Sequence, residues 1–130
     1  MAESAEIIPY IFYRSVPDAL DWLARVFGFA EELRHVNPGG GMHAQMRFGG
    51  QRIMLGTSST VWNLRTPAET GTPTQGVFIY VDDVAAQHAR SAAGAANPDA
   101  LADHGYGLTF TVHDLDGHPW YFTQRSALDV

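Results

Sequence analysis

The first half of the chain alternates short strand-like runs with one amphipathic stretch. Ile7–Tyr13 is rich in β-branched and aromatic residues, which predicts a strand. From Pro17 to Phe27, apolar residues recur at helical spacing, and Gly28 stands where a helix stops. Three more strands are predicted, separated by glycine-rich turns, over residues 32–36, 43–48 and 52–55. The predicted order is strand, helix and three strands.

The same order returns after a segment rich in Thr, Ser, Pro and Gly. Val77–Val81 predicts a strand, and Asp82 and Asp83 are candidate N-caps of a helix that ends before Gly94. Further strands are predicted over residues 108–112 and 120–124. The helix-stopping glycines, Gly28 and Gly94, lie 66 residues apart, and the turn glycines, Gly50 and Gly117, lie 67 apart. We therefore expect two similar modules, about residues 5–56 and 76–126, joined by a loop over residues 57–75.

Composition narrows the class of protein. The chain has 130 residues, 45% hydrophobic and 17% charged, as in a folded domain. A net charge of -6 and eight scattered Lys and Arg residues disfavour nucleic acid and anionic membranes as partners. The absence of cysteine excludes disulfides and thiolate metal sites. Because Met1 to Pro9 has no signal-peptide pattern and no apolar run reaches about 20 residues, we expect a soluble cytoplasmic protein.

Several motifs, taken in order, carry a resemblance to a known family. The strand from Val77 runs into Asp82-Asp83-Val84, its helix closes on Ala92-Ala93-Gly94-Ala95, and a later turn contains Asp114-Leu115-Asp116-Gly117-His118-Pro119-Trp120. With residues 8–12 and 19–29 of the first half, the chain resembles the glyoxalase/bleomycin-resistance/dioxygenase group of the vicinal oxygen chelate (VOC) superfamily over nearly its whole length. The resemblance implies an α+β fold of two βαβββ modules whose curled mixed sheets surround a cleft. It also implies a homodimer, sometimes with modules exchanged between chains.

Enzymes of this superfamily hold a divalent metal with four side chains from the first and last strands of each module. The positions that match them here are Ile8, Met54, Gly76 and Tyr121. Hard divalent ions prefer carboxylate and imidazole ligands, and this set offers neither. We therefore expect no metal at that site and no cofactor. A different site, built from His43, an acidic residue and His104, is the remaining metal alternative.

Strand alternation places several aromatic residues on the same face as these four positions. Together with two residues of the fourth strand and a loop tryptophan, they predict a ligand-binding cleft. The candidate ligand-binding residues are Tyr10, Phe12, Arg52, Met54, Trp62, Phe78, Tyr80 and Tyr121. Two other interpretations stay open. The aromatic residues could form the core, and Trp62 could be buried in a dimer interface.

The sequence thus favours a metal-independent protein that binds a small organic ligand, in the manner of bleomycin-resistance proteins. The ligand would be an aromatic or cationic compound such as an antibiotic, since an acidic protein suits a cation. The alternative is a glyoxalase-like lyase or isomerase, or a dioxygenase, that uses a non-standard site or acid–base chemistry by Tyr121, Tyr80 or His43. A dimeric module that acts only through protein contacts is the third interpretation.

Overall fold

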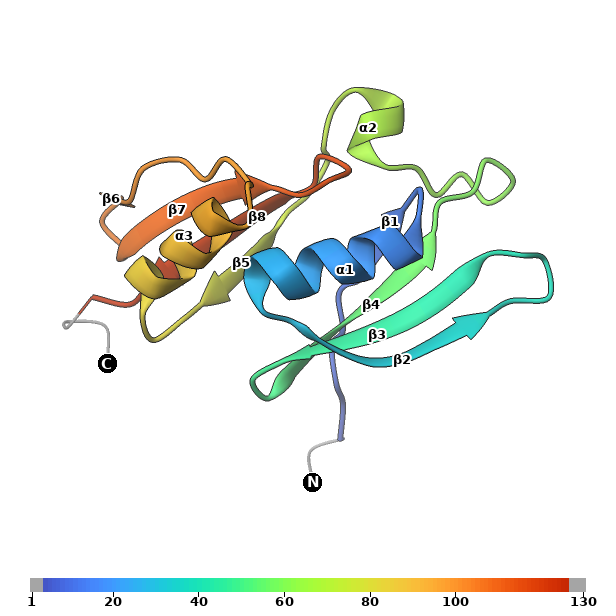
Figure 1. The fold of residues 1–130 in the computed structure, drawn as a ribbon, viewed down its shortest axis with the longest axis horizontal. Helices are drawn as coiled ribbons and strands as arrows, with labels where there is room; N and C mark the ends of the chain where they lie inside the picture. Colours follow the sequence, from blue (N-terminus) through green and yellow to red (C-terminus); the bar gives the residue numbers. More distant parts are fainter. Residues whose placement is uncertain (1–3, 127–130) are drawn as a thin grey trace.

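The computed structural model describes residues 4–126, which form two four-stranded sheets and three helices (Figure 1). The first sheet has the order β1 (Tyr10–Tyr13), β4 (Gln51–Thr57), β3 (Met42–Phe48) and β2 (Ala30–Val36). The second has the order β5 (Val77–Tyr80), β8 (Pro119–Gln124), β7 (Leu108–His113) and β6 (Ala102–Asp103). In each sheet the first pair is parallel and the other two are antiparallel. The identical order confirms the predicted α+β fold of paired βαβββ units.

Strand register gives the two sheets the same internal alignment. In the first parallel pair, Tyr10 lies opposite Met54, and in the second, Phe78 lies opposite Tyr121. Met54 and Tyr121 are therefore equivalent positions. The 67 residues between them equal the spacing of the turn glycines. The sequence offset thus reflects a structural repeat.

The two main helices start and stop at the predicted signals. In α1 (Val16–Phe27), the Ser15 hydroxyl caps the backbone N–H of Asp18, and in α3 (Val84–Ala93), Asp83 caps Ala86. Gly94 ends α3 with a backbone conformation that any residue can adopt, so glycine is needed there for space and not for its backbone freedom. A Cβ at this position would lie 2.9 Å from Cγ2 of Val26, where the two helices cross. None of the helices in the described part of the chain is long and apolar enough to span a membrane.

Three details differ from the sequence-based expectations. β1 begins at Tyr10 and not at Ile7, since Pro9 has no N–H to donate to a strand ladder. The expected loop contains a short helix, α2 (Pro67–Thr70), which a capping box between Thr66 and Glu69 stabilises. The backbone hydrogen bond from Thr66 holds the pKa of Glu69 below its ordinary value. The two-residue strand β6 was also not expected.

Both helices pack on the same side of the two sheets (Figure 1). The core between helices and sheets is aromatic, and its largest fully buried side chains are Trp120, Tyr13, Phe27, Phe110 and Phe122. Because both helices are on this side, neither of them covers the opposite side of either sheet. Tyr10, Phe78 and Tyr80 point to that side and are 44–45% exposed. They are therefore not core residues, and we call the two uncovered sides the open faces.

A buried carboxylate joins the two modules at one end. Oδ2 of Asp114 accepts hydrogen bonds from the Tyr13 hydroxyl (2.7 Å) and Trp120 Nε1 (2.9 Å). Its Oδ1 accepts from the backbone N–H groups of Asp116 (3.0 Å) and His118 (2.9 Å). Asp116 in turn accepts from the backbone N–H (2.7 Å) and the guanidinium of Arg14. We call these residues the Asp114 cluster. It ties the end of β1 to the β7–β8 turn.

Candidate ligand-binding site

The first open face carries a prearranged pair of rings. Tyr10 and Phe12 alternate with the buried Ile11 and stack with ring centroids 4.8 Å apart. The Tyr10 hydroxyl forms a 3.0 Å hydrogen bond with Nδ1 of His43, which holds the ring across the sheet. Gly56 lies beneath, and a Cβ there would be 2.9 Å from Tyr10 Cε1. The missing side chain lets both rings lie close to the sheet.

The second open face carries a larger aromatic group. Phe78 stacks on Tyr121 at 6.4 Å and meets Tyr80 edge-on at 5.2 Å. Tyr106 extends the group, with its ring 5.8 Å from Phe78. The guanidinium of Arg125 lies 3.6 Å from the centre of the Tyr80 ring, a cation–π arrangement. Tyr106 was not predicted, because it lies in an irregular loop with no periodic signal.

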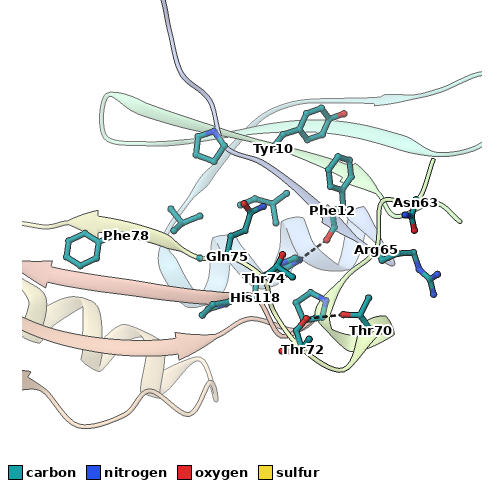
Figure 2. A pocket seen from close by; sticks show the side chains of 16 residues that line it. Tyr10, Phe12, Asn63, Arg65, Thr70, Thr72, Thr74, Gln75, Phe78 and His118 are labelled. Atoms are coloured by element: carbon teal, nitrogen blue, oxygen red, sulfur yellow. Dashed lines mark hydrogen bonds between the residues drawn. The ribbon is translucent and has the colours of Figure 1, made fainter. Parts of the chain in front are cut away.

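A cavity of about 620 Å³ lies between β1 and β5, where the two open faces meet (Figure 2). We call this gap the seam and the space the seam cavity. Its aromatic lining comes from both strands: Tyr10 and Phe12 from β1, and Phe78 from β5. The linker before β5 supplies a polar wall with hydroxyl, amide and guanidinium groups: Asn63, Arg65, Thr70, Thr72, Thr74 and Gln75. None of these linker residues is in the predicted set, although the capping box at Thr66 could have indicated an ordered linker.

The predicted binding residues do not all line the same cavity. Tyr10, Phe12 and Phe78 line the seam cavity, whereas Arg52 and Tyr80 line a second cavity of about 650 Å³ near the β3–β4 turn. Met54 and Tyr121 lie on the open faces, outside the lining of both cavities. The structure therefore brings together only part of the predicted set in one cavity.

Trp62 lies at the tip of a small hairpin and lines neither cavity. Backbone hydrogen bonds of 2.7 and 2.8 Å between Ser59 and Leu64 close the hairpin, and the Ser59 hydroxyl accepts from the Trp62 N–H. The tryptophan is 77% exposed. In the single chain it is thus neither a buried residue nor part of a cavity wall.

Three of the arginines near the open faces are paired. Arg47 forms an ion pair with Glu32 (2.8 Å), and Arg52 pairs with Glu6 (3.2 Å). Arg65, at the rim of the seam cavity, lies 3.6 Å from Glu69. Around these three arginines the charges are therefore balanced, whereas Arg125, over the Tyr80 ring, forms no ion pair within residues 4–126.

The residues at the family's metal positions do not fit a divalent ion. Ile8, Met54 and Gly76 offer no oxygen or nitrogen side-chain donor, and Tyr121 alone cannot hold a hard cation. A Cβ at Gly76 would lie 2.7 Å from Tyr121 Cε2, so that ring fills the space a ligand side chain would need. Within residues 4–126, no three His, Asp or Glu side chains gather in a way that could hold an ion. His43 and His104 belong to different modules.

Replacing Gly76 with alanine should test this close approach. The new methyl group would meet both the Tyr121 ring and the Pro119 carbonyl oxygen, at 2.7 and 2.9 Å. We expect the free energy of unfolding to fall by about 1–3 kcal/mol, measured by urea denaturation. Gly39→Ala is the matched control, because a Cβ there meets nothing within 4 Å. Equal stability of the two variants would contradict the packing described for Tyr121.

Comparisons with known proteins agree with this architecture. The family model described as Glyoxalase/Bleomycin resistance protein/Dioxygenase superfamily matches residues 6–122. Among solved structures, TioX from Micromonospora sp. ML1 is 31% identical, with a TM-score of 0.75 over 95% of this chain and 100% of that one. No curated protein matches.

Two more distant structures share the fold. TnmS3, an antibiotic binding protein from Streptomyces sp. CB03234, is 19% identical, with a TM-score of 0.70 over 96% of this chain and 100% of that one. The bleomycin-binding protein from bleomycin-producing Streptomyces verticillus, solved with copper(II)-bleomycin, is 18% identical, with a TM-score of 0.70 over 97% and 100%.

Proposed function

Because the chain belongs to the glyoxalase/bleomycin resistance protein/dioxygenase superfamily, we propose that it binds a planar aromatic small molecule, such as an antibiotic, without a metal. The observation that carries the proposal is the exposure of Tyr10, Phe78 and Tyr80 on the open faces, beside a cavity of about 620 Å³. Exposed aromatic groups next to a concave surface are typical of ligand or partner sites. The bleomycin-binding protein and TnmS3 support this class of function.

We further propose that the working form is a cytoplasmic homodimer. In one chain the two open faces lie side by side and leave aromatic rings in contact with water, which is unfavourable. A second copy can cover both faces and leave clefts between opposed aromatic groups. Trp62, exposed on its hairpin, would then lie at a cleft edge or in the subunit interface. Size-exclusion chromatography with light scattering measures the molar mass in solution and so tests whether the protein is a dimer.

The ligand we propose is uncharged. The acidic net charge of the chain favours a cation, but no carboxylate is among the residues that line the seam cavity. The carboxylates nearest the open faces are paired with arginines. Stacking on Phe78 and Tyr121, and not charge attraction, would therefore supply the affinity.

Titration with a panel of planar antibiotics, followed by tryptophan fluorescence, tests the proposal. We expect Tyr121→Ala to weaken binding by about 1–3 kcal/mol, because the variant removes a stacking ring. Val36→Ala, which removes an exposed apolar group from β2, should leave affinity unchanged. Should no compound bind the wild type, or should Tyr121→Ala unfold the protein without a separable binding defect, the proposal fails.

One observation favours an enzyme as the second candidate. The Tyr10 hydroxyl and His43 Nδ1 form a hydrogen bond on the open face, and such a pair can transfer protons. A glyoxalase-like lyase or isomerase would also need a Lewis acid. We expect nickel, zinc, manganese and iron to leave the melting temperature unchanged. An increase that a chelator reverses would favour the enzyme, since a bound ion stabilises the folded state by mass action.

A further inference from the structure

We propose that the seam cavity binds a neutral sugar attached to the aromatic ligand, so that the ligand is an aryl glycoside. This inference rests on the proposed function, because the same open faces hold the aromatic part. It adds that the second part of the ligand is a sugar, which the polar wall would recognise. Figure 2 shows the two walls: Tyr10 and Phe12 on one side of the cavity, and Thr70, Thr72 and Thr74 on the other.

The polar wall presents groups that suit hydroxyls. The hydroxyls of Thr70 and Thr72 bond to backbone carbonyls of the linker, which leaves their oxygens as acceptors toward the cavity. Thr74 and Gln75 form no side-chain hydrogen bond with any residue between 4 and 126, so they can both donate and accept. Sugar hydroxyls are also donors and acceptors at once. A purely apolar substituent would bury these polar groups without partners, which costs free energy.

The aromatic wall suits the other side of a sugar ring. A pyranose presents C–H groups on its faces and hydroxyls around its edge. The stacked rings of Tyr10 and Phe12 can cover a C–H face, while the linker groups meet the hydroxyls. A volume of about 620 Å³ lies within the range of small-molecule pockets and exceeds the need of one fused ring system.

The linker wall is also held in place before any ligand arrives. The capping box of α2 fixes Thr66, and the Ala68 N–H donates to the Asp116 carbonyl at 2.9 Å, which fastens the linker to the Asp114 cluster. Because no carboxylate lines the cavity and Arg65 is near Glu69, the wall favours a neutral sugar over an amino or phosphorylated one. A prearranged wall lowers the ordering cost of binding.

The test compares methylumbelliferone, a planar coumarin, with its hexosides and with the methyl hexosides that lack the coumarin. By isothermal titration, we expect at least one methylumbelliferyl hexoside to bind the wild type about tenfold more tightly than methylumbelliferone. The methyl hexosides should bind too weakly to measure. The double variant Thr74→Val, Gln75→Leu should lose the tenfold advantage and keep the affinity for methylumbelliferone. Thr60→Val, an exposed threonine outside the cavity, is the matched control.

The outcomes separate this inference from the proposed function. Equal affinity for the coumarin and all its hexosides would overturn the sugar subsite and leave aromatic binding intact. A hexoside advantage that survives in the double variant would also overturn it, because the sugar would then bind elsewhere. Failure of the coumarin and every hexoside to bind would overturn the sugar subsite and count against the proposed function.

Discussion

Asp114→Asn should lower the free energy of unfolding by about 3 kcal/mol, although the two side chains have the same shape. All four partners of the carboxylate are donors: Tyr13 and Trp120 on one oxygen, and two backbone N–H groups on the other. An asparagine has one oxygen only, so its NH₂ group must face two donors. Because Asp114 is 6% exposed, water cannot satisfy these groups.

Urea denaturation followed by tryptophan fluorescence measures this loss. Asp21→Asn makes the same chemical change at a side chain that is 80% exposed, and we expect a change within about 0.5 kcal/mol. A loss below about 1 kcal/mol in Asp114→Asn would mean that the Asp114 cluster does not hold the two modules together.

Alkaline pH should destabilise the protein through Tyr13. Burial raises the pKa of this phenol well above its ordinary value, and the negative charge of Asp114 raises it further. The unfolded chain ionises near pH 10, whereas the folded chain keeps the proton to higher pH. The stability that Tyr13 contributes is therefore complete below about pH 10 and is lost as pH rises through the folded pKa. The loss approaches about 1.4 kcal/mol per pH unit.

Tyr13→Phe separates this effect from other causes of alkaline unfolding. At pH 7 the variant should be about 1–3 kcal/mol less stable, because Asp114 loses a buried donor. Above pH 10 its stability should fall less steeply than that of the wild type, so the two curves converge. Tyr106→Phe, an exposed tyrosine, should keep the wild-type slope. Parallel curves of stability against pH for wild type and Tyr13→Phe would show that Tyr13 does not cause the alkaline loss.

Local signals in the sequence were enough to predict most of the fold. Pro17 and Gly28 located the first helix, and Asp83 and Gly94 located the second. Strand alternation correctly separated Tyr10 and Phe12 from Ile11 and Tyr13, because side chains of a strand must point to opposite sides. These features depend on neighbours a few residues away.

The candidate site was harder to predict, since it depends on contacts between distant segments. Residues 114–118 were identified as a turn, but Asp114 bonds with Tyr13, 101 residues earlier. Arg52 was predicted to bind the ligand, yet it pairs with Glu6 and Glu32 through contacts that no sequence pattern indicates. Tyr106 and the threonines of the linker reach the open faces only because irregular segments fold back over them.

The seam between β1 and β5 has a mechanical consequence. In the described residues, no backbone ladder crosses it, so each sheet keeps all its strand pairs if the gap widens. The Asp114 cluster fixes one end, and Gly94 lets α3 pack closely on α1. A small rigid-body tilt therefore changes the width of the cavity without breaking a strand ladder, at the cost of the side-chain hydrogen bonds that join α1 to α3. Such a scaffold can adapt to molecules of different thickness without a change in its strand pairing.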